Sequence, residues 1–230
     1  MAADWDLFID ETKEGGKLKC LGVLALHAGV AEGIFAQLAK AKNALVSRGN
    51  KVGEIHWKDL GEVEAEVAQE WLSLFLGGPM MFFVVALCMP AETKETAVTR
   101  VLQALENDSR VPYGLARDRT TIHVDADSSD PPDMLRQLRS RFRLLRAFSW
   151  ESKGSLLLQL CDLLLGIALA DSSGSLNSLS PDASSRQKLK HRLLQYARCN
   201  AQARARRGKR NGVVLLQPGG GAEFLLLGKM

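Results

Sequence analysis

The sequence predicts an α/β domain in which a mixed β-sheet is flanked by α-helices. Three observations support this: a strand–turn–strand pattern at the start, a nearly all-apolar strand in the middle, and alternating helical and strand-like segments around it. With 230 residues, the chain can form one well-cored domain. Apolar residues make up 46% and charged residues 24%, as in ordinary globular proteins rather than disordered chains.

The chain is predicted to open with an antiparallel β-hairpin. Residues 4–12 and 18–26 both have strand-like sequences. Gly15 and Gly16 lie between them, and such a glycine pair is a strong signal for a tight hairpin turn.

The middle of the chain alternates between helical and extended segments. Apolar spacing predicts helices over 32–48, 63–75, 92–106 and 131–142, and strand-like sequences lie at 80–89, 119–125 and 144–150, with a short extended piece at 54–57. Residues 80–89 (MMFFVVALCM) are nearly all apolar, so we expect a central strand covered on both faces. Residues 156–170 are apolar on all sides, which indicates a buried helix.

The last quarter of the chain has a different composition. Residues 171–185 are rich in Ser, Asp, Gly and Pro and are predicted to be a linker or mobile loop. A basic helix over 186–207 and a terminal hairpin follow. We therefore expect the main domain over 1–170, with 186–230 as a helix-and-hairpin extension of the same domain.

Charge is distributed unevenly along the chain. Residues 1–182 contain 19 Lys/Arg against 25 Asp/Glu, whereas residues 183–230 contain 11 against 1. The basic tail indicates a polyanionic partner such as nucleic acid, although a solvated charged helix explains it nearly as well.

The composition also indicates a compartment. The acidic start lacks the pattern of a signal peptide, and the apolar run at 156–170 is shorter than the roughly 20 residues of a membrane span. The four cysteines are far apart with no C-x-x-C pair, which favours reduced thiols over a zinc site or disulfides. We expect a cytoplasmic protein with no membrane contact, and the oligomeric state stays open.

Carboxylates at two extended segments are the first candidates for chemistry. Asp10 and Glu11 end the first strand, and adjacent side chains of a strand point to opposite faces, so only one can enter a shared site. In the extended piece, Glu54, His56 and Lys58 share one face. Taken alone, each group is better explained by a turn or a solvated strand edge than by a functional site.

Asp125 and Asp162 are two further candidates, the first from its position at the end of a strand and the second from its apolar surroundings. Asp125 ends a strand, and open α/β sheets bind ligands at such ends. Asp162 lies inside LLLQLCDLLLG, and an isolated buried carboxylate must find a partner or become protonated. The partner is either Lys153 or an arginine, or a divalent cation shared with other carboxylates.

Together these acids fit the oxygen ligands that Mg²⁺ or Mn²⁺ prefers. Two such ions can activate water and stabilise the leaving oxygen of a phosphodiester displacement. Lys153 or a nearby arginine is then a candidate for a phosphate contact.

The same segments resemble a widespread prokaryotic family, domain of unknown function 3800. The matching motifs are Phe8–Thr12 (FIDET), Glu54–Trp57 (EIHW), Asp125, and Ser152-Lys153 followed by Leu158–Leu163 (LQLCDL). Their order and rough spacing agree over residues 5–170. Cys161 stands where the family often has alanine, and the basic tail lies outside the resemblance.

The resemblance implies a ribonuclease H-like or integrase-like fold with a carboxylate-bound two-metal site. Carried over by motif, its metal ligands and catalytic residues are Asp10, Glu54, Asp125 and Asp162. The role of Glu11, which also lies in the first motif, stays open.

Two basic groups are candidates for contacts with nucleic acid. Arg136, Arg139 and Arg143 share one helix face and could contact phosphate, although solvated arginines explain them slightly better. In the tail the candidates are Arg198, Arg204, Arg206, Arg207, Lys209 and Arg210.

The sequence therefore predicts a metal-dependent nuclease, a hydrolase of phosphodiester bonds in RNA or DNA. The alternative is a non-catalytic nucleic-acid-binding or accessory protein that kept the fold. A third possibility is an interaction module in which Asp162 pairs with Lys153. The choice between RNA and DNA, and between endonuclease and exonuclease action, stays open.

Overall fold

The computed structural model describes residues 5–91, 93–107, 119–126, 130–144, 146–205, 213–217 and 221–225. In chain order the elements are β1 (Trp5–Glu14), β2 (Lys17–His27), α1 (Ala28–Val46), α2 (Glu62–Gly77), β3 (Met80–Ala91), α3 (Lys94–Asn107), β4 (Thr120–Asp125), α4 (Met134–Phe142), β5 (Arg146–Trp150), the 3₁₀ turn η1 (Ser152–Gly154), α5 (Leu156–Ser173), α6 (Ser185–Ala205), β6 (Val213–Gln217) and β7 (Gly221–Leu225).

The predicted opening hairpin is confirmed. β1 and β2 pair antiparallel from Trp5 opposite His27 to Glu14 opposite Lys17. The turn residues Gly15 and Gly16 have φ angles of 57° and 79°. Side chains rarely tolerate these left-handed angles, so the glycine pair permits the tight turn.

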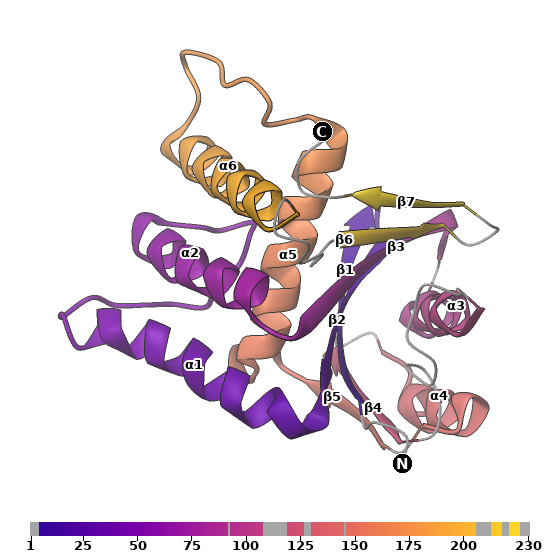
Figure 1. Ribbon diagram of the computed structural model, residues 1–230. Coiled ribbons are helices and arrows are strands. Elements are labelled where there is room, and N and C mark those ends of the chain that lie inside the picture. Colours follow the sequence, from indigo (N-terminus) through magenta and orange to yellow (C-terminus); the bar gives the residue numbers. More distant parts are fainter. Residues whose placement is uncertain are drawn as a thin grey trace.

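The strands of the described residues form one mixed sheet with the order β5-β4-β1-β2-β3-β6-β7 (Figure 1). β2 runs antiparallel to its neighbours β1 and β3, while β4 and β5 run parallel to β1. On the other side, β6 pairs parallel with β3 and forms the terminal hairpin with β7. This confirms the predicted α/β class: a mixed sheet flanked by helices, with a basic C-terminal helix and a last hairpin.

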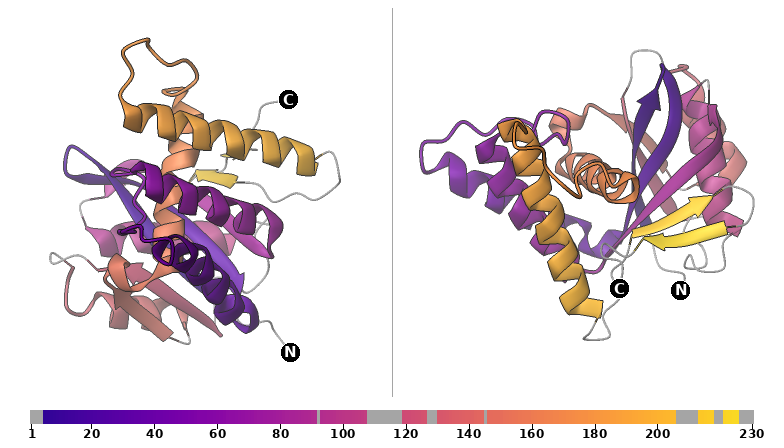
Figure 2. Two further views of the ribbon diagram at one scale, coloured as in Figure 1. Left: turned by 90° about the vertical axis from the view of Figure 1, so that its left-hand side faces the viewer. Right: turned by 90° about the horizontal axis from the view of Figure 1, so that it is seen from above.

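Helices cover both faces of the sheet (Figure 2). Strand alternation sends Leu7 and Ile9 of β1 into the core beneath α3 and α4. Phe8, between them, enters the core shared with α1, α2, α5 and α6. The two faces of β1 therefore belong to two different layers.

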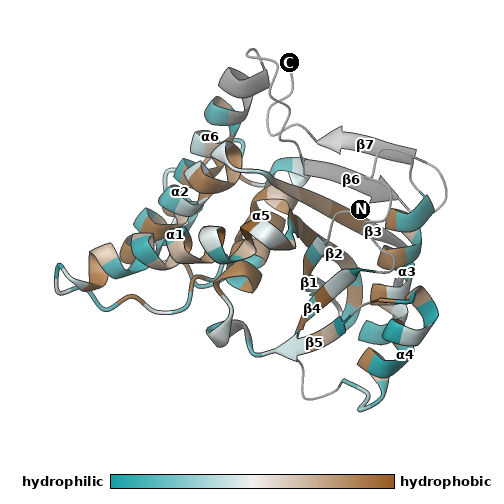
Figure 3. Cartoon of the chain, turned by 60° about the horizontal axis from the view of Figure 1, so that its bottom comes forward, coloured by the Kyte–Doolittle hydropathy of each residue, from teal (hydrophilic) through white to brown (hydrophobic). Residues whose placement is uncertain are grey.

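Helix α5 is the central helix of the larger layer, as its all-round apolar sequence predicts. Twelve of its residues are buried, and it lies between the sheet and the helices α1, α2 and α6 (Figure 3). The helix is long and apolar enough to cross a membrane, and 67% of it is buried inside the domain. Its packing against two layers accounts for its apolar character.

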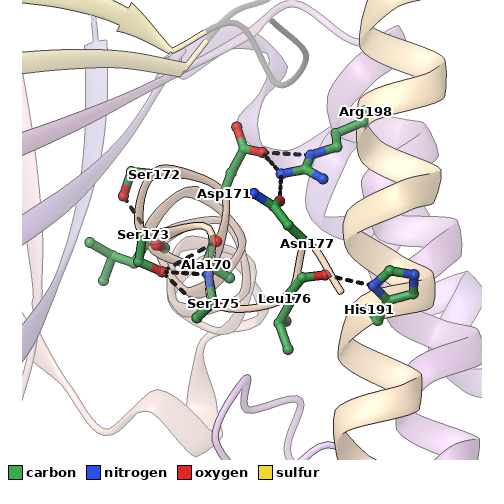
Figure 4. Close-up of polar contacts among 10 residues, drawn as sticks. Ala170, Asp171, Ser172, Ser173, Ser175, Leu176, Asn177, His191 and Arg198 are labelled. Atoms are coloured by element: carbon green, nitrogen blue, oxygen red, sulfur yellow. Dashed lines mark hydrogen bonds and ion pairs between the residues drawn. The ribbon is translucent and has the colours of Figure 1, made fainter. Parts of the chain in front are cut away.

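The segment predicted as a linker is partly helical and is tied to α6. Helix α5 continues to Ser173 and ends at Gly174, which has a left-handed φ of 66°. Arg198 of α6 binds Asp171 of α5 at 2.5–2.6 Å and Asn177 of the loop at 2.7 Å (Figure 4). The linker therefore begins later than predicted, and its first half is anchored.

Apolar contacts fix α6 to the rest of the domain. Leu189, Leu193 and Leu194 are buried in the core that contains α2 and α5. In addition, the Ser73 hydroxyl of α2 lies 2.5 Å from the Tyr196 hydroxyl. The apolar stripe that the sequence indicated on this basic helix therefore packs on the domain.

Candidate active site

Asp10 and Glu11 point to opposite sides of β1, as strand alternation predicts. Asp10 shares the α5 face with Phe8 and is 9% exposed. Its Oδ1 accepts a hydrogen bond of 2.8 Å from the backbone N–H of Glu11. The Glu11 carboxylate lies on the α3 side, 2.9 Å from Nζ of Lys94. Only Asp10 therefore enters the site on the α5 face.

Strand β4 brings Asp125 beside Asp10. In the parallel register Ile9 lies opposite Val124, so the next residue of each strand is a carboxylate. Val124 is buried on the α3 side, which places the Asp125 side chain on the α5 face. The backbone carbonyl of Asp125 accepts a 2.7 Å hydrogen bond from Lys94, which joins α3 to the end of β4.

Helix α5 contributes Asp162. Its Oδ2 accepts hydrogen bonds from the Trp57 backbone N–H at 2.7 Å and from Nδ1 of His56 at 3.2 Å. The Asp162 side chain is 23% exposed, so the prediction that it is the buried carboxylate was wrong, and Asp10 is more deeply buried. The reason is that this side of α5 faces the irregular segment before α2, which covers it only in part.

Glu54 reaches the site through His56. Nε2 of His56 lies 3.1 Å from the Glu54 carboxylate, so the ring bridges Glu54 and Asp162. The hydrogen bond to Asp162, helped by the charges of Asp162, Glu54 and Asp10, raises the pKa of His56 to about 9 despite partial burial. At neutral pH this side chain is therefore an imidazolium between two carboxylates.

Two residues of α5 hold the Glu54–Trp57 segment, which has no regular secondary structure, in place. Oε1 of Gln159 accepts a 3.1 Å hydrogen bond from the backbone N–H of Ile55. At Gly166 a Cβ atom would lie 2.1 Å from Cγ of Trp57, so only glycine lets this ring pack on the helix. Sequence reasoning missed both roles, although Gln159, Asp162 and Gly166 follow each other at spacings of three and four on one helix face.

Lys190 of α6 reaches the same segment and was also missed. Its Nζ lies 5.2 Å from the centroid of the Trp57 ring and donates a 3.4 Å hydrogen bond to the Lys58 carbonyl. Burial, and to a lesser extent Arg186, lowers the pKa of Lys190. The basic helix thus places one cation beside the acidic site.

The four predicted acids Asp10, Glu54, Asp125 and Asp162 converge on one site. Burial raises the pKa of Asp10 well above its usual range, and the charges of Asp162, Asp125 and Glu11 raise it further. Such a surplus of carboxylate oxygens around a buried acid fits a hard divalent cation. Within the described part of the chain, no three His, Cys, Asp or Glu side chains already stand in a metal-ligand grouping, so binding would require these side chains to adjust.

The predicted phosphate contacts lie in different places. Arg136 and Arg139 belong to α4 and Arg143 is its C-cap residue, across the sheet from α5, and Arg136 pairs with Asp133 at 2.8 Å. The structure does not bring them to the carboxylates. Lys153 is exposed in η1, just before α5, and the described partners of Asp162 are His56 and Trp57 instead.

The predicted nucleic-acid contacts of the tail are described only in part. Arg198 binds Asp171 and Asn177 within the domain. Arg204 lies in the last turn of α6. The others, Arg206, Arg207, Lys209 and Arg210, lie outside the described residues.

Comparisons with known proteins give coarse matches. No protein-family model matches the chain, and no curated protein matches it. A chain of the complex of PCNA with RNase HII from Archaeoglobus fulgidus is 13% identical, with a TM-score of 0.40 over 80% of this chain and 84% of that one. Ribonuclease H2 from Pyrococcus horikoshii OT3 is 12% identical, with a TM-score of 0.40 over 90% of each chain. Membership of the domain of unknown function 3800 family stays a prediction.

Proposed function

We propose that this protein is a divalent-metal-dependent nuclease that hydrolyses phosphodiester bonds in RNA or DNA. One observation carries the proposal: carboxylates from β1, β4, α5 and the segment before α2 converge around the buried Asp10. These segments are far apart in the sequence, and folding brings four acids together at an electrostatic cost. A bound cation would remove that cost.

Asp10, Glu54, Asp125 and Asp162 are the residues that would hold Mg²⁺ or Mn²⁺. When bound, such ions supply activation of water and neutralisation of charge at the leaving oxygen. Asp10 and Asp125 come from neighbouring parallel strands, and Asp162 faces them from the helix. In this layout the carboxylates come from three different elements.

The surrounding residues act as positioning groups. The Trp57 N–H and the His56 ring hold Oδ2 of Asp162 and so fix the orientation of its carboxylate. Lys94 fixes the end of β4 from the other face of the sheet. Lys190 adds a positive charge near the site, where a phosphate would be attracted.

One observation favours the alternative of a non-catalytic nucleic-acid-binding or accessory protein. His56 already pairs with Glu54 and Asp162, so part of the negative charge is neutralised by the protein itself. In that case the fold would bind nucleic acid through its basic surface. Such binding would be sensitive to salt and insensitive to chelator.

The test is cleavage of a panel of single- and double-stranded RNA and DNA in Mg²⁺ or Mn²⁺. We expect cleavage by the wild type, loss of at least about a hundredfold in Asp10→Asn and Asp162→Asn, and no change in the control Asp182→Asn, whose side chain is exposed in a loop. Thermal unfolding with and without Mn²⁺ gives a second readout, because a ligand of the folded state raises the melting temperature. Cleavage that survives both site substitutions would refute the proposal, and chelator-insensitive binding without cleavage would favour the alternative.

A further inference from the structure

Beside the carboxylates, aromatic side chains lie next to one another across the α5 face of β1, β4 and β5. In the parallel registers, Phe8 of β1 lies opposite His123 of β4, and His123 lies opposite Phe148 of β5. One step further along, Asp125 lies opposite Trp150. The candidate active site and an aromatic row are therefore neighbours on one sheet face.

The aromatic rings follow one another from Phe8 on β1 toward the edge of the sheet at β5. His123 stacks on Phe8 with a centroid distance of 4.4 Å and an interplanar angle of 7°. Phe148 lies 5.6 Å from His123, and Trp150 lies 5.9 Å from Phe148. We call His123, Phe148 and Trp150 the aromatic platform.

The platform ends on β5, which is the edge strand of the sheet (Figure 1). Trp150 is 45% exposed, and among the described residues it is one of three exposed large apolar side chains, with Phe35 and Val46. Phe35 and Val46 lie on α1. A tryptophan that continues a series of rings beside an acidic site is suited to contact a ligand, because its ring is large and its N–H can donate a hydrogen bond.

The Trp150 ring is held in position before any ligand binds. Its indole N–H donates a 3.0 Å hydrogen bond to Nδ1 of His123. Because indole can only donate, Nδ1 carries no proton and Nε2 is the donor to Asp6, at 3.2 Å. A ring fixed in this way loses little freedom on binding, which favours its use as a contact surface.

We propose that the aromatic platform binds an unpaired nucleobase of the strand whose phosphodiester bond lies at the carboxylates. This inference rests on the proposed function and adds a substrate class, nucleic acid with single-stranded character at the cleavage site. Stacking on aromatic side chains is how proteins hold unpaired bases without reading their sequence. Arg146 lies in the same row of β5 as Phe148 and Trp150 and is exposed, so it is placed to contact a phosphate of that strand.

A duplex fits this surface less well. Inside a duplex both faces of a base are covered by its neighbours, whereas the platform offers a ring that must meet a free face. Asp125, directly opposite Trp150, also places negative charge close to the ring, so the group beside it has to be a base rather than a second phosphate.

The experiment measures the affinity of the wild type and of Trp150→Ala, Trp150→Leu and Trp150→Phe for a short fluorescent single strand and for the matching blunt duplex. Each affinity is measured in EDTA and in Ca²⁺. We expect alanine and leucine to weaken single-strand binding by roughly 5- to 100-fold, the effect of losing one stacked base, and phenylalanine to retain most of it. The matched control is Phe35→Ala, because Phe35 is 43% exposed and lies on α1. Quenching of tryptophan fluorescence by the bound strand should decrease in Trp150→Phe, in which Trp57 is the tryptophan left beside the site.

The outcomes separate this inference from the proposed function. Weakened single-strand binding in Trp150→Ala, with Phe35→Ala unchanged, supports the platform even if the wild type fails to cleave in Mn²⁺. Wild-type affinity in Trp150→Ala overturns the platform even if cleavage is normal. Equal losses for single strand and duplex, or quenching that is undiminished in Trp150→Phe, overturn it as well.

Discussion

Asp10 shows how a candidate ligand differs from an ordinary buried acid. Burial and the charges of Asp162, Asp125 and Glu11 all raise its pKa, and the one described hydrogen bond to it comes from the Glu11 backbone. An acid with a raised pKa weakens the folded state once it ionises. Without a bound cation, ionisation of Asp10 therefore lowers the free energy of unfolding.

We predict that Asp10→Asn stabilises the metal-free protein at neutral pH. In the wild type, the favourable contribution of the protonated acid is complete below its unfolded pKa, near 4, and is lost as pH rises through the raised folded pKa. The amide introduced by Asp10→Asn does not ionise, so the variant does not lose this stability. The melting temperature of Asp10→Asn minus that of the wild type should therefore grow as pH rises. Each 1 kcal/mol gained corresponds to about 2–4 °C for a chain of this size.

Thermal unfolding in EDTA from pH 4 to pH 8 measures the effect. Asp182→Asn, at an exposed loop position, should follow the wild type across the range. A difference between Asp10→Asn and wild type that is no larger at pH 8 than at pH 4 would contradict the prediction.

At the same scale, the sequence identified the right acids for partly incorrect reasons. The apolar context of Asp162 suggested full burial, yet the side chain is 23% exposed and bonded to His56 and Trp57. Asp10 was selected by motif, and it is the buried one. Burial depends on which element covers a side chain. Asp10 faces α5, which comes much later in the chain, and Trp57, which binds Asp162, lies 105 positions before it.

At the scale of the element, α5 combines a core helix with one functional face. Its apolar residues pack on the sheet and on three helices, while Gln159, Asp162 and Gly166 face the segment that contains Glu54 and Trp57. The helix therefore holds both the carboxylate and the loop that orients it.

We predict that Gly166→Ala destabilises the protein although alanine favours helices. The new methyl group would overlap the Trp57 ring, where the closest atom lies 2.1 Å away, and such overpacking costs about 1–3 kcal/mol. The shifted ring would also disturb the hydrogen bond from Trp57 to Asp162. We expect lower stability in urea unfolding and reduced cleavage.

The control for this helix substitution is Gly33→Ala in α1. No atom lies within 4 Å of a Cβ atom at this position, so the gain in helix propensity, about 0.5–1 kcal/mol, should appear undiminished. If both substitutions stabilised the protein equally, the close packing of Trp57 on Gly166 would be refuted.

At the scale of the whole molecule, the basic helix and the preceding loop are attached to the main domain. Arg198 is 20% exposed and binds Asp171, which is 9% exposed, together with Asn177 of the loop. His191 donates a further 2.7 Å hydrogen bond to the Leu176 carbonyl (Figure 4). These contacts favour one domain over a body with a free appendage.

We predict that Arg198→Ala frees the loop over residues 174–184. Losing charge-assisted hydrogen bonds that are largely shielded from water costs about 1–3 kcal/mol, so limited proteolysis of this loop should accelerate by tenfold or more. Arg192→Ala, at an exposed position of the same helix, should be cleaved at the wild-type rate. Equal cleavage of the two variants would contradict an anchoring role for Arg198.

The sequence by itself determined the elements and their order, because local signals fix them. Gly15 and Gly16 specify the first turn, the apolar run at 80–89 specifies a covered strand, and the all-round apolar pattern at 156–170 specifies a buried helix. It also pointed to the four acids, partly through the family resemblance. The cytoplasmic location stays a prediction.

Only the tertiary structure decided which side chains meet. It placed α4 and its arginines across the sheet from the carboxylates, inserted His56 between Glu54 and Asp162, and set the aromatic platform beside Asp125. These relations depend on strand register and on helix packing between distant segments. Local sequence patterns do not encode them, because turn and periodicity signals extend over only a few residues.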